Sequence, residues 1–177
     1  MAKWIIDPDH SVAAFVIRHM MVADVRGQFN KLSGVVHFDP SNITGSSVEV
    51  TIDAAGIYTG IQKRDNHLRS ADFFDVANHP RIIFKSGKVE TAGAKHFTIV
   101  GNLTIRGITK TITLDVEYSE PEKSPYDGET TIGFAATTKT NREDFGLMWN
   151  VPLESGGVLV GKAVQIFIDM EADLTTA

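Results

Sequence analysis

The sequence contains no cysteine, and this absence removes several kinds of structure and chemistry at once. Disulfide bonds, thiol catalysis and cysteine-ligated zinc are all excluded. The chain also lacks a run of about 18 apolar residues, so it has no candidate for a membrane-spanning helix. Near the N-terminus, Asp7 and Pro8 come too early for the apolar core of a signal peptide. We therefore expect a cytoplasmic protein, or a periplasmic one if the chain is a processed form.

Positive charge is scarce as well. The 17 lysine and arginine residues are outnumbered by 22 aspartate and glutamate residues, which gives a formal charge of −5. This sign argues against nonspecific binding to nucleic acid, so we expect no nucleic-acid partner. The hydrophobic fraction of 42% is ordinary for a soluble globular protein. We expect one domain over residues 1–177, long enough to bury a sizeable core.

Alternating apolar and polar residues run through most of the chain and predict half-buried antiparallel strands. Val48, Val50 and Ile52 form one apolar face, and a longer face extends from Val164 to Ala172. About eight strands are expected from this pattern. They cover residues 10–19, 26–38, 48–53, 82–86, 97–105, 111–118, 130–140 and 164–173.

The strand over residues 11–17 is apolar on both faces. One face carries Val12, Ala14 and Val16, and the other carries Ala13, Phe15 and Ile17. A closed barrel crossed outside by a helix would keep both faces dry, and so would a barrel that holds an apolar ligand. Two sheets packed as a sandwich would do the same. The pattern alone does not choose between barrel and sandwich.

Residues 61–75 form a charged segment that predicts a short helix within a chain of strands. Ile61 and Leu68 are seven residues apart and would share one helical face. Asp65 and Arg69 have the spacing of an acid–base pair that supports an exposed helix. The aromatic pair Phe73 and Phe74 follows directly, and a small protein would normally bury these two side chains.

A second polar segment, residues 141–150, follows a predicted strand. Arg142 and Asp144 flank a turn there and are expected to form a local ion pair, while its apolar residues suit either a plug or the mouth of a lipid pocket. Arg64 and Asp65 also allow two interpretations. They form either a solvated helix face or a polar mouth that orients a ligand.

Metal-binding and catalytic motifs are missing. None of the six histidines has the close spacing of a zinc motif, and His10 and His19 would lie roughly 30 Å apart in a straight strand. No serine lies in a Gly-x-Ser-x-Gly elbow, and the glycines at 101 and 107 belong to a predicted hairpin. We expect no metal, no cofactor and no catalytic residue.

Several separated blocks of the sequence resemble the YceI-like family, also called polyisoprenoid-binding proteins. The blocks occur in order over nearly the whole chain, which is hard to obtain by chance. They are Asp9-His10-Ser11 with Phe15 and His19; Gly27-x-Phe29 with Gly34; Thr59 with Arg64-Asp65-x-His67-Leu68-Arg69-Ser70 and Asp72-Phe73-Phe74-Asp75; His79-Pro80 with Phe84-x-Ser86; Gly101-x-Leu103-Thr104-Ile105-x-Gly107; and Arg142-x-Asp144-Phe145-Gly146-Leu147-x-Trp149.

The resemblance implies an all-β, lipocalin-like, extended antiparallel β-barrel of about eight strands with a short helix between strands. It implies that an apolar tunnel binds a polyisoprenoid, an isoprenoid quinone or a related long-chain lipid, without catalysis, for carriage, storage or sequestration. One face of the strand over residues 11–17 would line the tunnel, and the other would pack under the helix. Family members are usually dimeric and many are exported, so a homodimer is expected.

The expected ligand-binding residues form two groups. Polar residues near one end of the tunnel would select the head group, and they are His19, Arg64, Asp65, Arg142 and Asp144. Wall residues, chosen by strand parity, are Phe15, Ile17, Phe29, Val36, Phe38, Val50, Ile52, Leu103, Leu114, Val116, Phe134, Trp149, Ile166 and Ile168.

Two alternatives to a lipid carrier stay open at this point. An enzyme acting on a hydrophobic substrate would need a histidine and a carboxyl group as general base and acid deep in the cavity. A purely structural or interaction module would fill its core with side chains and leave almost no cavity.

Overall fold

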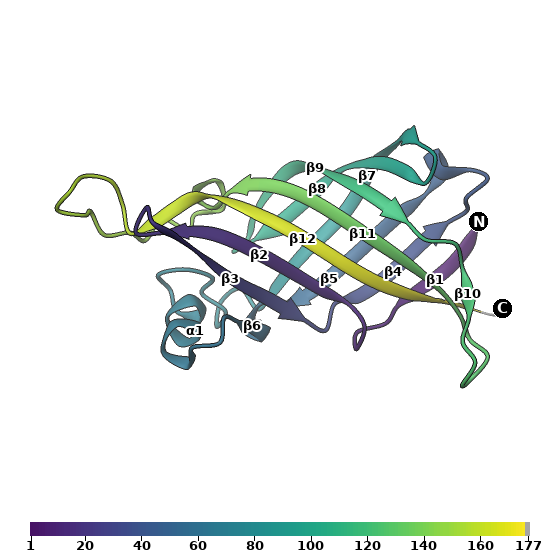
Figure 1. Ribbon diagram of the computed structural model, residues 1–177, viewed down its shortest axis with the longest axis horizontal. Coiled ribbons are helices and arrows are strands. Elements are labelled where there is room, and N and C mark those ends of the chain that lie inside the picture. The colour runs from purple at the N-terminus through teal and green to yellow at the C-terminus, as the bar shows by residue number, and fades with distance from the viewer. Residues whose placement is uncertain (176–177) are drawn as a thin grey trace.

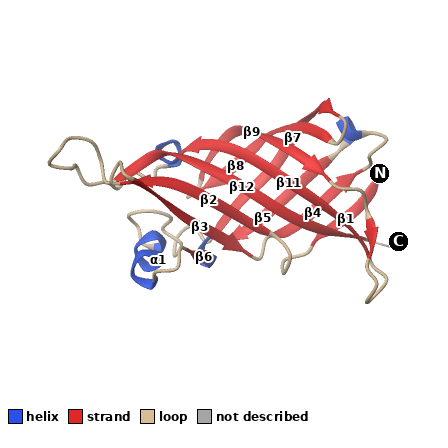
Figure 2. Cartoon of the chain, viewed as in Figure 1, coloured by secondary structure: helices blue, strands red, loops and turns tan. Residues whose placement is uncertain are grey.

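The structure is a computed structural model that describes residues 1–175, and most of it is strand (Figure 1 and Figure 2). The strands are β1 (Ala2–Ile6), β2 (Val12–His19), β3 (Ala23–Asn30), β4 (Ser33–Phe38), β5 (Ser47–Asp53), β6 (Ile57–Tyr58), β7 (Arg81–Gly93), β8 (His96–Ile105), β9 (Ile108–Tyr118), β10 (Glu122–Lys123), β11 (Thr130–Asn141) and β12 (Val160–Leu174). The helices are α1 (Gln62–Arg69) and the short 3-10 turns η1 (Ile43–Gly45), η2 (Ala54–Gly56) and η3 (Arg142–Phe145). No helix within residues 1–175 has the length and apolar character that crossing a membrane requires.

Antiparallel strands close into a barrel. The ring runs β11, β9, β8, β7, β5, β4, β1, β12, and the ladder between β12 and β11 closes it. The long strand β12 pairs on its other side with β2 along one part and with β1 near its end. The hairpin of β2 and β3 therefore extends the wall beyond the ring, and β6 pairs with the edge of β3. The expected lipocalin-like barrel with one short helix is confirmed.

Aromatic side chains fill the end of the barrel near the two termini. Phe38 is only 1% exposed, and its ring centroid lies 5.9 Å from that of Phe97, 4.8 Å from Tyr118 and 5.2 Å from Phe134. Trp4 Nε1 donates a 3.3 Å hydrogen bond to the carbonyl of Phe38. These edge-on and stacked contacts close this end of the barrel.

The opposite end is covered by the segment from η2 to α1 (Figure 1). The buried carboxylate of Asp65 accepts hydrogen bonds from the Thr59 backbone N–H at 2.9 Å and from its hydroxyl at 2.5 Å. Arg64 Nε donates to the same hydroxyl at 2.7 Å. A Cβ atom at Gly27 would lie 2.8 Å from Thr59 Cγ2 and 2.4 Å from the Phe15 ring, so glycine allows this segment to approach β3.

Two strand predictions need correction. Residues 26–38 are not one strand, because the chain bends between β3 and β4 at Lys31, whose φ of 58° breaks the extended backbone. Strand β1 is missing from the sequence prediction. It is only five residues long, although Trp4 and Ile6 alternate inward at 4% and 2% exposed.

The contacts of α1 also differ from those predicted. Ile61 does not share a helical face with Leu68, because it precedes the first helical residue and is 53% exposed. The expected pair of Asp65 with Arg69 is not formed, since Arg69 instead donates to backbone carbonyls in η2 and β6 at 2.7 and 2.8 Å. The helix does not cover the outer face of β2 either; it packs beside β6.

The connection between β1 and β2 contains an ion pair that predicts a pH dependence. His10 Nδ1 lies 2.6 Å from the Asp7 carboxylate, and this hydrogen bond raises the pKa of His10 and lowers the pKa of Asp7. The contribution of His10 to stability is full below the ordinary histidine pKa and is lost as the pH rises through its raised pKa. The contribution of Asp7 is present above the ordinary aspartate pKa and is lost as the pH falls through its lowered pKa.

Asp7→Asn should therefore lower the pKa of His10 toward its ordinary value, as measured by NMR titration of the imidazole ring. The difference in unfolding free energy between the wild type and this variant should be greatest between about pH 4 and 6.5. An unchanged pKa of His10 in the variant would show that the pair has no effect.

Candidate ligand cavity

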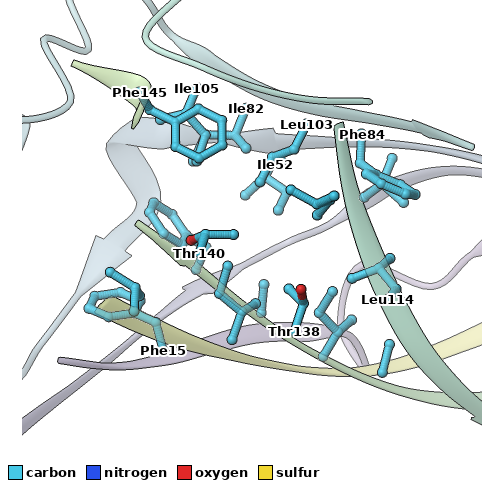
Figure 3. A pocket seen from close by; sticks show the side chains of 18 of the residues that line it. Phe15, Ile52, Ile82, Phe84, Leu103, Ile105, Leu114, Thr138, Thr140 and Phe145 are labelled. Carbon is cyan, nitrogen blue, oxygen red and sulfur yellow. The ribbon is translucent and has the colours of Figure 1, made fainter. Parts of the chain in front are cut away.

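The barrel encloses a cavity of about 370 Å³, which lies within the range that small-molecule sites occupy. Figure 3 shows apolar side chains such as Ile52, Phe84 and Leu114 projecting into it from different strands. Thr138 and Thr140 are the polar side chains labelled there, and the Thr138 hydroxyl already donates to a backbone carbonyl of β9 at 2.8 Å. The wall therefore offers dispersion contacts rather than hydrogen bonds.

The structure brings together nearly all the residues that the sequence analysis selected. Among the polar candidates His19, Arg64 and Arg142 line the cavity, whereas Asp65 and Asp144 do not. Asp65 is buried against the Thr59 segment, and Asp144 is exposed. Contact of any of these residues with a ligand stays a prediction. The predicted wall residues that line the cavity are Phe15, Ile17, Phe29, Val36, Phe38, Val50, Ile52, Leu103, Leu114, Val116, Phe134, Trp149, Ile166 and Ile168.

Other wall residues were not selected from the sequence, although strand parity points to most of them. Ala136 follows two positions after Phe134, and Ile105 follows two positions after Leu103, so each shares the inward face of its neighbour. The two-residue period gives no such signal for Leu68 and Phe73, which reach the cavity from α1 and the segment after it. Further residues on the strands line the cavity and were not selected from the sequence: Ile82, Phe84, Val89, Phe97, Ile99, Ile112, Thr138, Thr140, Val164 and Met170.

A cluster of three rings lies where the cavity meets α1. The ring of His67 lies 5.1 Å from that of Phe73 and 4.7 Å from that of Trp149, both edge-on, and Phe73 lies 5.5 Å from Trp149. Phe73 is buried, while His67 and Trp149 are half-buried. This cluster connects α1 with the chain after η3, and all three of its rings line the cavity. We call this end of the cavity, which lies opposite the aromatic end, the mouth.

Arg142 also lies at the mouth, where it lines the cavity. Its guanidinium donates to the carbonyls of Leu147 at 2.5 Å, Trp149 at 3.0 Å, Gly161 at 2.7 Å and Val160 at 3.3 Å. The side chain is 5% exposed, and this burial lowers the pKa of the guanidinium, which stays charged at neutral pH. The residue thus fastens two segments of the mouth together.

The predicted ion pair between Arg142 and Asp144 is wrong. The guanidinium is directed to four backbone carbonyls, whereas Asp144 lies on the surface. A charged group in a buried turn is satisfied as well by carbonyl oxygens as by a carboxylate, and the sequence spacing does not distinguish the two.

Ionisable groups are confined to one end of the wall. His19 at the end of β2, Arg64 and His67 in α1, Arg142 and the neighbouring Arg18 line the cavity, and no aspartate or glutamate does so within residues 1–175. His67 Nε2 has a carboxylate partner in Asp72 at 2.8 Å, but Asp72 is outside the wall. The enzyme alternative requires a histidine and an acid that both line the cavity. Within residues 1–175 the structure brings no such pair together.

Asp7, His10 and Glu171 gather away from the cavity. One ligand atom from each lies within 4.8 Å of the others, and no other such trio occurs within residues 1–175. His10 and Glu171 are exposed, and Asp7 already accepts hydrogen bonds from His10 and from the Asp9 backbone. The ion pair in the β1–β2 connection explains why these groups lie together.

The fold and the cavity define a lipocalin-like barrel with an apolar internal chamber. Residues 4–172 match the YceI-like domain, and the chain belongs to the YceI-like family. It is 36% identical to UPF0312 protein SA2479 of Staphylococcus aureus, with 99% of each chain covered.

Solved structures have the same fold. BcnA of Burkholderia cenocepacia is 26% identical with a TM-score of 0.80, covering 94% of this chain and 98% of that one. A polyisoprenoid binding domain from Saccharophagus degradans has a TM-score of 0.70 at 15% identity, covering 99% of this chain and 100% of that one. The second likeness extends to the fold alone.

Proposed function

We propose that the protein binds the chain of a polyisoprenoid, an isoprenoid quinone or a related long-chain lipid inside the barrel, and carries, stores or sequesters it unchanged. The observation that carries this proposal is the 370 Å³ apolar cavity whose ionisable groups lie only at one end. A molecule that fits this distribution has a long apolar chain and one polar head. The description of the Saccharophagus degradans neighbour as a polyisoprenoid binding domain supports the same class of ligand.

The orientation of the ligand follows from the two ends of the cavity. The chain would extend toward the aromatic rings of Phe38, Phe97 and Phe134, while the head would remain near His19 and Arg64. Burial contributes roughly 25 cal/mol per Å² of apolar surface, reduced by the cost of ordering the chain. Affinity should therefore rise with chain length until the chain reaches the aromatic end.

Native mass spectrometry of protein purified without detergent tests the proposal. We expect an additional mass that organic extraction releases as an intact isoprenoid or other long-chain lipid. Extraction of a chemically altered product after incubation with a defined lipid would favour the enzyme alternative. The proposal would be overturned if the purified protein carried no lipid and took up no added geranylgeraniol, a prenyl alcohol.

Trp149 should report ligand entry by fluorescence. It lines the cavity, whereas Trp4 is 4% exposed and is outside the wall. Titration with geranylgeraniol should change the tryptophan emission of the wild type and of Trp4→Phe. Trp149→Phe should lose the change, and a response that survives in this variant would place the ligand elsewhere.

A further inference from the structure

The turn between β2 and β3 has two methionines where other residues are strongly preferred. Met20 and Met21 have φ angles of 51° and 64°, and the N–H of Val22 donates to the His19 carbonyl at 3.1 Å. Positive φ at both central residues marks a type I′ turn, for which Asn-Gly is the favoured sequence, and Val22 follows it before Ala23 pairs with His19. Within residues 1–175, no other two adjacent non-glycine residues have positive φ. A local rule broken in this way is expected where function outweighs stability.

The side chains that this turn presents are apolar and open to solvent. Met20 is 46% exposed, Met21 is 56% exposed and Val22 is 73% exposed. Val151, on a neighbouring loop, is 42% exposed. We call these four residues the apolar tip. Contiguous exposed apolar side chains on a soluble domain mark an interaction surface.

The loop over residues 151–159 lies beside the turn and extends beyond the end of the barrel (Figure 1). The N–H of Met20 donates to the Leu159 carbonyl at 2.7 Å, and the Leu159 N–H donates to the Val151 carbonyl at 2.9 Å. Met21 packs against Gly157, since a Cβ atom there would lie 3.3 Å from Met21 Cγ. The turn and the loop therefore present one surface.

This surface borders the mouth of the cavity. His19 directly precedes the turn, and the Leu159 carbonyl accepts a hydrogen bond from the turn residue Met20. His19 and Leu159 both line the cavity, whereas Met20 and Met21 do not. A ligand that entered or left the cavity at this end would pass beside the apolar tip.

Several charged side chains lie on the elements next to the tip, and Glu154 in the loop over residues 151–159 is exposed. Arg18 binds Asp24 at 3.3 Å, and Lys162 binds Glu143 at 3.1 Å. Each pair is neutral as a whole, and the carboxylate of Glu154 would repel an anionic partner rather than attract it. Flexible thioether side chains beside neutral pairs suit a fluid apolar phase better than a protein surface with directional polar groups.

We propose that the apolar tip docks on a lipid bilayer and holds the mouth of the barrel against it while the ligand is transferred. This inference rests on the proposed function, because a long-chain lipid is almost insoluble in water and must be taken from a membrane. The tip enters the interfacial region of the bilayer through Met20, Met21 and Val22, without anchoring the protein permanently.

The double substitution Met20→Asn with Met21→Gly separates docking from folding. It gives the turn its favoured sequence, so the thermal unfolding midpoint should be unchanged or higher. In flotation with vesicles of pure phosphatidylcholine, binding should fall about tenfold relative to the wild type. Binding of the wild type should be similar at about 0.1 M and about 1 M salt, because it does not depend on charge.

Tyr126→Ser provides the matched control. Tyr126 is 96% exposed but lies in the β10–β11 connection at the other end of the barrel, and its loss should leave flotation unchanged. Equal flotation of the double variant and the wild type would overturn the docking proposal. The proposal would also be overturned by a wild type that does not float with the vesicles. A wild type whose apolar tip is buried by self-association, detected as an oligomer in size-exclusion chromatography, would overturn it as well.

Ligand transfer distinguishes failure of docking from failure of the proposed function. The wild type and the double variant should show the same change in Trp149 fluorescence when geranylgeraniol is added in ethanol. From vesicles, the double variant should take up geranylgeraniol about tenfold more slowly than the wild type. Equal rates from vesicles would overturn docking and leave the cavity as the binding site. No response in either assay would overturn the proposed function itself.

Discussion

Replacing Arg142 with methionine should lower the free energy of unfolding by about 3 kcal/mol. Methionine keeps the apolar length of the side chain but removes the donors that satisfy the carbonyls of Leu147, Trp149, Val160 and Gly161. Unpaired carbonyls in a buried site cost desolvation free energy, which water can recover only if the mouth opens. Urea unfolding followed by circular dichroism measures the loss.

Two other arginines provide graded controls for this prediction. Arg81→Met should be nearly neutral, because that side chain is exposed. Arg106→Met should be intermediate, since Arg106 donates to only two carbonyls, those of Gly146 at 2.6 Å and Ala71 at 3.0 Å. A loss at Arg142 no larger than that at Arg81 would show that the four carbonyl bonds contribute no net stability.

The barrel is largely predictable because its signal is local. A strand with one face toward a cavity must alternate every second residue, so the pattern in β5, β9 and β12 is legible without knowledge of their partners. The bend at Lys31 leaves no comparable signal, because a lysine with positive φ is chosen by the surrounding structure and not by its own preference. The partners of Arg69 depend in the same way on how η2 and β6 pack against the helix.

The apolar wall of the site is also predictable, whereas its charged residues are not. Once Phe134 is placed inward, parity places Ala136 inward too, and both line the cavity. For Asp65, Asp144 and Arg142 the sequence reveals the charge of the side chain and its place along the chain, but not the direction in which the side chain points. Asp65 and Arg142 are directed to hydrogen-bond partners within the protein framework, Thr59 in one case and backbone carbonyls in the other. Buried charges follow the demand for hydrogen-bond partners, which arises only in the folded chain.

Ala136→Phe should shorten the space available to the ligand without harming the fold. Ala136 faces the cavity about midway along β11, between Phe134 toward the aromatic end and Thr138 toward the mouth. A phenyl ring there would occupy empty space, so the unfolding midpoint should not fall. Exclusion of two buried methylene groups would already cost the ligand about 1.5 kcal/mol, roughly tenfold in Kd.

Ala135→Phe is the matched control, because the adjacent position points outward and is exposed. It adds the same ring to the same strand and should leave the Kd for geranylgeraniol unchanged. Shorter prenyl alcohols should bind Ala136→Phe nearly as well as the wild type, since they end before the new ring, and Trp149 fluorescence measures each Kd. An equal loss for short and long alcohols would mean that even a short chain reaches Ala136. The head of the ligand would then have to lie deeper in the barrel than the ionisable groups of the mouth.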